Sequence, residues 1–121
     1  DKGLRVVYRE FPILGADSVA AARASLAASK AGRFAAFHVA LYEAGNPIPE
    51  TLAIAGNASG IRPEQAQDPA IEAELESNYR LASALGATGT PLFVVGNQVI
   101  TSAVGYEAYK EAVAKARAAK G

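Results

Sequence analysis

The sequence predicts an α/β domain in which a strand, several helices, a β-hairpin and a last helix follow one another. Short runs rich in valine, isoleucine and aromatic residues, at the start of the chain and in its last third, are typical of strands. The long middle carries apolar residues at helical spacing. No repeat, low-complexity tract or linker divides the chain, so we expect a single domain over residues 1–121.

Length and composition narrow the classes of function. With 121 residues, the chain can form one domain with a modest core. It has 12 Lys and Arg residues against 12 Asp and Glu residues, a zero formal net charge that argues against a nucleic-acid partner. No apolar run approaches the roughly 20 residues that cross a bilayer, so we expect no membrane insertion. The absence of cysteine excludes thiol catalysis, disulfides and thiolate metal sites within these residues.

The first half of the chain predicts one strand and two long helices. Leu4–Arg9 has the composition of a strand, and Phe11-Pro12 ends it. Asp17 is a good N-cap for a helix over about 17–31, and Gly32 separates it from a second helix over about 33–44. The second helix carries a broad stripe made of Phe34, Phe37, His38, Leu41 and Tyr42.

The second half predicts a short helix, a long helix and a last helix. The short one covers about 50–58 and ends near Gly60. Asp68-Pro69 starts the long helix, because a capping residue precedes a proline at the first helical position. Its inward face consists of Ile71, Leu75, Asn78, Ala82 and Leu85. The last helix follows Gly105, and the residues expected to face inward are Tyr106, Tyr109, Val113 and Ala116.

The stretch from Gly86 to Asn97 is the segment around which we expect the chain to be organised. Gly86 is suited to end the long helix in a left-handed conformation. Thr90 precedes a proline and is therefore expected to be extended. Leu92–Val95 predicts a buried strand, which Gly96-Asn97 turns back into Gln98–Thr101.

This stretch carries a family resemblance. Gly89-Thr90-Pro91-Leu92-Phe93-Val94-Val95-Gly96-Asn97 resembles the Thr–cis-Pro segment of thioredoxin-fold proteins, and the surrounding chain is similar to the DsbA-like thiol–disulfide oxidoreductases of bacterial envelopes. Three further pieces occur in the family's order: Leu4–Leu14, Phe37–Leu41 and Asn78–Ala82. The resemblance implies a thioredoxin-like fold with a DsbA-type helical insertion at about 17–86.

The chain also departs from the family. A DsbA-like protein opens with a strand and a helix that carries Cys-x-x-Cys, whereas this chain begins where the second strand is expected. We therefore expect an N-terminally truncated domain. The missing strand would lie between Leu4–Arg9 and the strand that begins near Pro91, so we expect either a separate N-terminal segment or a homo-oligomer partner to complete the sheet. Direct pairing of Leu4–Arg9 with Leu92–Val95 is the alternative.

Gly89, Thr90 and Pro91 are the candidate substrate-binding residues. Only about 5–6% of X–Pro bonds are cis, which by itself favours a trans bond at Thr90-Pro91. The resemblance implies the opposite: a cis bond in a loop that offers its backbone to an extended peptide or protein substrate. It also implies a periplasmic or other extracytoplasmic location.

Three hypotheses for function remain open at this point. The first is part of a DsbA-like thiol–disulfide oxidoreductase or isomerase that retains the docking loop without the redox cysteines. The second is a non-catalytic peptide-binding or chaperone-like module, and the third is a relative that processes glutathione or small molecules on the same scaffold. The sequence upstream of Asp1 separates them. Cys-x-x-Cys there favours the first hypothesis, and a lone serine favours the third. If neither is present, the second hypothesis is favoured.

Other residues favour structural roles. His38 is the only histidine, but it lies on the stripe with Phe34 and Leu41, which indicates a packing role. Glu72, Glu74 and Glu76 alternate along one helix, and alternate helical residues do not share a face. We therefore expect no catalytic residue, metal site or cofactor in this chain.

Overall fold

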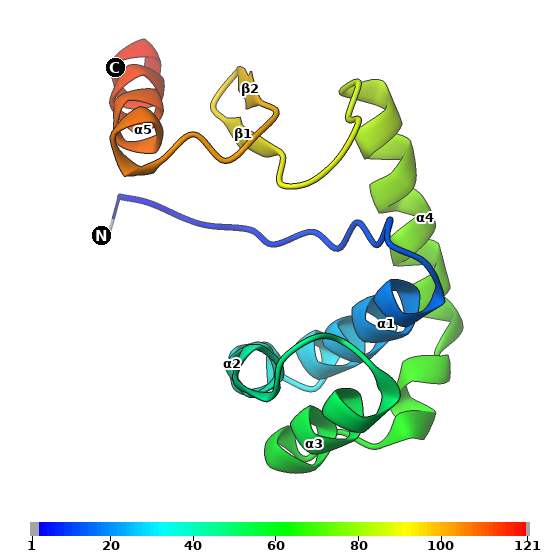
Figure 1. Ribbon diagram of the computed structural model, residues 1–121. Helices are drawn as coiled ribbons and strands as arrows, with labels where there is room; N and C mark the ends of the chain where they lie inside the picture. Colours follow the sequence, from blue (N-terminus) through cyan, green and yellow to red (C-terminus); the bar gives the residue numbers. More distant parts are fainter. Residues whose placement is uncertain (1–2, 121) are drawn as a thin grey trace. The chain divides into compact units, whose positions relative to one another are not determined.

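The structure is a computed structural model that describes residues 3–120. These residues form the following elements in order (Figure 1): α1 (Ala16–Lys30), α2 (Phe34–Ala44), α3 (Pro49–Ser59), the 3-10 helix η1 (Pro63–Gln67), α4 (Pro69–Ala84), β1 (Phe93–Val95), β2 (Gln98–Ile100) and α5 (Tyr106–Lys120). The chain divides into two compact units, Asp1–Tyr79 and Arg80–Gly121, and the division falls within the sequence of α4. Among the described helices, none has both the length and the apolar content to cross a membrane.

The helices predicted in the first unit are present, with ends within two residues of those expected. α1, α2 and α3 correspond to the predicted helices at 17–31, 33–44 and 50–58. Gly60 ends α3 in the left-handed conformation, with φ 75°, and the Ile61 that follows is buried. A glycine adopts this conformation without steric cost, which explains why the helix stops there. The sequence did not predict η1.

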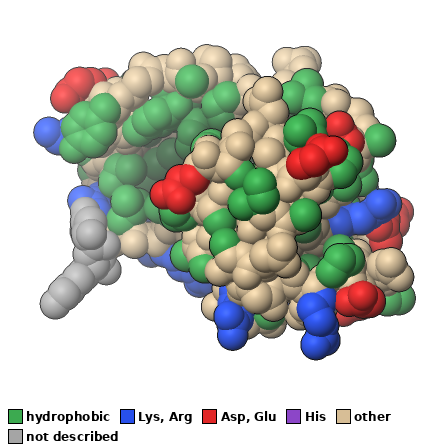
Figure 2. All heavy atoms as spheres, turned by 60° about the horizontal axis from the view of Figure 1, so that its bottom comes forward, with side chains coloured by type: hydrophobic (Ala, Val, Ile, Leu, Met, Phe, Trp, Pro, Cys, Tyr) green, Lys and Arg blue, Asp and Glu red, His purple; other side chains and the backbone are tan. Residues whose placement is uncertain are grey.

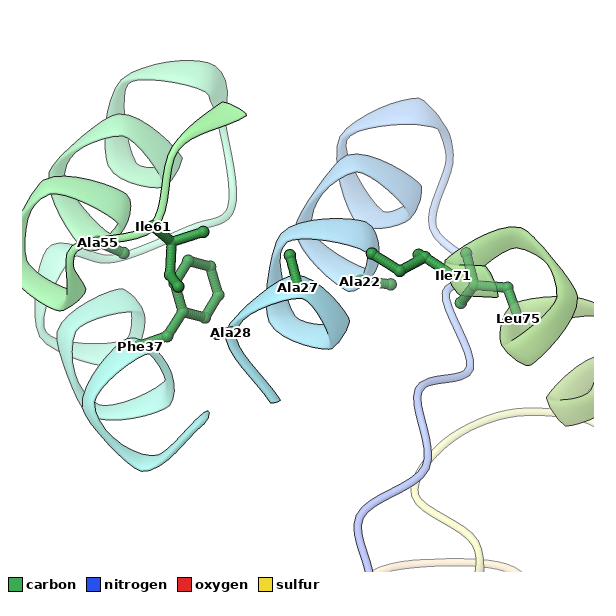
Figure 3. Packing of buried hydrophobic residues seen from close by; sticks show 8 residues of the cluster. All are labelled: Ala22, Ala27, Ala28, Phe37, Ala55, Ile61, Ile71 and Leu75. Atoms are coloured by element: carbon green, nitrogen blue, oxygen red, sulfur yellow. The ribbon is translucent and has the colours of Figure 1, made fainter. Parts of the chain in front are cut away.

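The core of the first unit is built from small side chains and a few large ones (Figure 3). Its buried members are Ala22, Ala27, Ala28, Phe37, Ala55, Ile61, Ile71 and Leu75. Phe37 of α2 lies beside Ile61 and Ala55 on one side of α1. Ile71 and Leu75 of α4 lie on the other side of α1. Phe37 and Ile71 are the largest side chains that are fully buried among the described residues. The apolar stripe predicted on α2 is only partly buried, because Phe37 is 1% exposed whereas Tyr42 is 76% exposed.

α4 begins as the sequence predicts. The Asp68 carboxylate accepts a hydrogen bond from the backbone N–H of Ala70 at 2.9 Å, which satisfies one of the free donors of the first turn. The Lys30 ammonium of α1 also binds Asp68. The hydrogen bond from Lys30, and next the one from Ala70, lower the pKa of Asp68 below its ordinary value of 3.8.

The prediction of a strand at Leu4–Arg9 is wrong. Leu4–Leu14 forms neither helix nor strand, and none of its backbone groups makes a backbone–backbone hydrogen bond among the described residues. Figure 1 shows this part of the chain as an extended trace before α1. A strand exists only with a hydrogen-bonded neighbour, and the one sheet in residues 3–120 contains β1 and β2 alone. Leu4–Arg9 therefore has the composition of a strand but lacks the hydrogen bonds to a second strand.

Side chains of α4 hold the part of this stretch that precedes α1. The buried Asn78 accepts a hydrogen bond from Arg9 Nε at 2.9 Å and donates one to the Glu10 carbonyl, also at 2.9 Å. The Tyr79 hydroxyl donates to the Pro12 carbonyl at 2.9 Å. These bonds position Arg9–Pro12, whereas the side chains of Leu4–Tyr8 are largely exposed.

The second unit contains the predicted hairpin and last helix. β1 and β2 are antiparallel, with Phe93 opposite Ile100, Val94 opposite Val99 and Val95 opposite Gln98. The two-residue turn at Gly96-Asn97 is the one expected from the sequence.

α5 packs on one side of this hairpin. The rings of Phe93 and Tyr109 have centroids 4.6 Å apart, and Gln98 Nε2 donates to the Ala112 carbonyl at 3.0 Å. Tyr106, expected to face inward, is 74% exposed instead, because the contacts with the hairpin begin one turn later, at Tyr109.

On the face drawn in Figure 2, hydrophobic side chains lie exposed between the charged groups.

Candidate peptide-docking site

The candidate site is the loop between α4 and β1. α4 ends at Ala84, and Gly86 then takes a positive φ of 71°, which allows the Ala87 N–H to bond the Ala82 carbonyl at 2.9 Å. The chain continues through Gly89, which is half-buried, to Thr90 and Pro91, which are exposed. The Thr90–Pro91 peptide bond is cis.

The backbone of this loop is open. Neither the N–H nor the C=O of Thr90 makes a hydrogen bond among the described residues. Within residues 80–120, β1 pairs with β2 along one edge, and no strand lies along its other edge.

The register of the hairpin identifies which groups face this free edge. A two-residue turn makes the flanking pair, Val95 and Gln98, a hydrogen-bonded pair, and the pairs then alternate along the ladder. Phe93 and Val95 therefore direct their N–H and C=O groups toward β2. Val94 directs its N–H and C=O toward the open edge. The loop is thus followed by a strand with unused backbone groups.

The stretch of sequence that contains the loop and the hairpin has no charged residue. No Asp, Glu, Lys, Arg or His occurs from Leu81 to Tyr106, although 20% of the whole chain is charged. Apolar side chains on the hairpin remain accessible, with Val94 54% and Val99 44% exposed. Such a surface can pair with an extended, uncharged segment through main-chain hydrogen bonds and apolar contacts.

The other residues considered from the sequence have structural surroundings. His38 lies on α2 between aromatic rings. Glu72 pairs with Arg23, and Glu72, Glu74 and Glu76 are exposed. No group of three or more His, Cys, Asp or Glu side chains in residues 3–120 is arranged to hold a metal ion.

Two features of the structure go beyond the sequence predictions. The first is the free N–H and C=O of Val94, for which the signal was the two-residue turn at Gly96-Asn97 that sets the pairing register. The second is the contact of Tyr8 with α2, which joins residues far apart in the chain.

Solved structures share this fold. A thioredoxin-like oxidoreductase from Silicibacter pomeroyi DSS-3 is 38% identical, with a TM-score of 0.83, and the match covers 93% of this chain and 68% of that one. A periplasmic thioredoxin-like protein from Salmonella enterica serovar Typhimurium is 26% identical, with a TM-score of 0.80, over 91% of this chain and 64% of that one. The catalytic domain of Proteus mirabilis ScsC is 26% identical, with a TM-score of 0.78, over the same shares.

The fold is therefore of the thioredoxin-like class. The profile of the DSBA-like thioredoxin domain matches residues 1–114, so the chain belongs to that family. The chain spans about two thirds of the length of the solved relatives. No curated protein matches the sequence.

Proposed function

We propose that this chain is the substrate-docking part of a DsbA-like thiol–disulfide oxidoreductase or isomerase in the periplasm or another extracytoplasmic compartment. The observation that carries the proposal is the exposed Gly89-Thr90-Pro91 loop, whose open backbone leads into the free edge of β1. Family membership and the description of one relative as a periplasmic protein support it. The redox chemistry of such an enzyme requires a reactive thiolate, and these 121 residues contain no cysteine.

In this proposal the loop and β1 hold a substrate as an added strand. Its main chain would pair with the backbone of Thr90 and with the N–H and C=O of Val94, while the exposed apolar side chains of the hairpin contact its apolar side chains. The chain positions the substrate and takes no part in electron transfer.

The test is binding of an extended, uncharged, labelled peptide to the 121-residue chain. We expect the largest amide shifts in ¹⁵N NMR at Gly89, Thr90 and Val94. Val94→Pro removes the outward N–H at a position that does not donate to β2, and should weaken binding about three- to ten-fold, the effect of one hydrogen bond. Val94→Ala keeps that N–H and is the matched control. Equal affinity of both variants, or shifts confined to other residues, would contradict the docking role.

A second measurement addresses chemistry. The purified chain should match the blank in insulin-reduction and scrambled-ribonuclease assays, because it has no thiol. The sequence that precedes Asp1 in the gene separates the alternatives. Cys-x-x-Cys there supports the oxidoreductase. A lone serine supports a relative that processes glutathione or small molecules. If neither is present, the result supports a peptide-binding or chaperone-like module.

The Leu4–Arg9 segment supports a further part of the proposal, a partner that completes the sheet. Its backbone forms no ladder, and Val6 and Val7 are 63% and 64% exposed. We propose that it becomes a strand when a separate N-terminal segment or a second copy lies beside it.

Light scattering and hydrogen exchange test this partner. In a monomer, the amides of Leu4–Arg9 should exchange fast, and they should slow when a dimer forms or when the upstream segment is added. Protected amides in a monomer without any added segment would contradict the proposal.

A further inference from the structure

A row of four rings lies on the first unit, outside the proposed docking loop. Phe34, His38 and Tyr42 follow one another at intervals of four residues on α2, and Tyr8 comes from the extended stretch before α1. The ring centroids of Tyr8 lie 5.4 Å from Phe34 and 5.6 Å from His38. Those of His38 lie 5.2 Å from Phe34 and 4.7 Å from Tyr42. We call these four residues the aromatic row.

His38 occupies the centre of the aromatic row. Its ring contacts all three of the other rings, and it is half-buried. Among residues 3–120 it forms no hydrogen bond or ion pair. Tyr8 and Tyr42 are therefore the described tyrosines in ring contact with it, and neither carries a carboxylate that could form an ion pair with His38.

The charged groups of the surrounding elements bind elsewhere or stay exposed. Those with other partners are Arg9 with Asn78, Glu10 with Ser25, Arg23 with Glu72, Lys30 with Asp68, and Arg33 with the Ser59 carbonyl. Those that are exposed and form no ion pair with His38 in the described residues are Arg5, Asp17, Glu43 and Glu50. A proton on His38 would therefore face aromatic rings rather than a carboxylate.

We propose that His38 is a pH-dependent anchor for the Leu4–Arg9 segment. Histidine is the side chain whose charge normally changes between about pH 5 and pH 8. A cation within about 6 Å of an aromatic ring centroid is attracted by the quadrupole of the ring, so with centroids 5.6 Å apart protonation of His38 strengthens its contact with Tyr8. The segment is then held more firmly on α2 in acid than at neutral pH.

The effect is confined to the part of the chain before Arg9. Arg9 and the Glu10 carbonyl bind Asn78, and the Pro12 carbonyl binds Tyr79, through hydrogen bonds that do not involve His38. Val6 and Val7 of the segment are largely exposed, and Tyr8 supplies its ring contacts with α2. If the segment pairs with a partner strand as proposed above, acid makes it less available, but the anchor itself does not depend on that proposal.

Limited thermolysin digestion of the 121-residue chain tests the anchor. Cleavage before Leu4, Val6 and Val7, identified by mass spectrometry, reports release of the segment. Dividing the rate for Tyr8→Ser by the rate for the unchanged chain at each pH cancels the pH dependence of the protease. This protection ratio should rise about two- to five-fold between about pH 7.5 and pH 5.5, as expected for a cation beside an exposed ring.

His38→Phe is the matched control, because it keeps a ring at this position and cannot be protonated. Its protection ratio, taken against the Tyr8→Ser, His38→Phe double variant, should not change with pH. A ratio that is flat or falls in acid for the unchanged chain, or that rises equally in His38→Phe, overturns the proposal. The Tyr8–His38 ring NOE of the unchanged chain, followed over the same pH range, gives the answer without any substitution and should strengthen in acid.

Discussion

The two units of the chain differ in how they bury apolar side chains. The unit Asp1–Tyr79 has a cluster of eight buried residues drawn from α1, α2, α3, α4 and Ile61, which follows the C-cap glycine of α3. In the part of Arg80–Gly121 that the structure describes, Ala112 is the one buried apolar residue. Large apolar side chains of its hairpin and of the following loop, Phe93, Val94, Val99 and Val104, stay between 38% and 54% exposed.

We expect this difference to separate the residues that stabilise the fold from those that bind a substrate. The helical unit has the packing of a core, so substitutions inside it should act on folding. The unit with the hairpin contains the uncharged segment Leu81–Tyr106, with accessible apolar side chains and a free strand edge, which suits binding better than stability. We expect the two units to respond differently to the same kind of truncation.

The largest effect is expected at Phe37. Its side chain is 1% exposed and lies against Ile61 and Ala55. Phe37→Ala should lower the free energy of unfolding by about 3–5 kcal/mol, measured by urea denaturation. Val39→Ala on the same helix is the control, because Val39 is 54% exposed and its loss should change stability by less than about 0.5 kcal/mol. Similar losses for both would mean that the core is not packed as described.

Asn78 should come next. Asn78→Ala removes the partners of Arg9 Nε and of the Glu10 carbonyl and should cost about 1–3 kcal/mol. It should also loosen Arg9–Pro12, which proteolysis at Arg9 would detect. Ser77→Ala, at an exposed neighbouring position, is the control. Unchanged stability and unchanged cleavage at Arg9 would show that the two hydrogen bonds do not hold the segment.

Gly96 tests the second unit. Its φ is 62°, and a Cβ there would lie 2.9 Å from the Cβ of Ala116. Gly96→Ala should destabilise the contact of the hairpin with α5 by about 1–2 kcal/mol through the backbone conformation, with the close contact adding to this. Hydrogen exchange of the hairpin amides measures it. A double-mutant cycle with Ala116→Gly should recover only the part due to the contact; full recovery would show that the positive φ has no cost.

The smallest effect is expected at Asp68. Its pKa is lowered in the folded chain by Lys30 and the Ala70 N–H, so the stability it contributes is present at neutral pH and is lost as the pH falls through the folded pKa. Asp68→Asn keeps a capping oxygen but has no charge. The urea midpoint of the unchanged chain should exceed that of the variant slightly at pH 7, and the difference should vanish in acid. A difference that persists below the folded pKa would exclude the ion pair as its source.

The sequence by itself determined the α-helices of this protein and its hairpin. Asp68-Pro69 starts α4, Gly60 ends α3, and Gly96-Asn97 closes the hairpin. These signals are local: a cap, a left-handed glycine or a turn depends on residues a few positions apart, so spacing alone locates them. The loop Gly89-Thr90-Pro91 was singled out differently, through the family resemblance that its neighbouring residues carry, and its docking role stays a prediction.

The tertiary structure decided what depends on distant neighbours. Leu4–Arg9 has the composition of a strand but forms none, because a strand requires a second strand that its own residues cannot supply. The partners of Asn78 are 69 and 68 positions away, at Arg9 and Glu10, and Tyr8 reaches α2 from outside that helix. Such contacts arise only when the helices have packed, so no spacing rule predicts them.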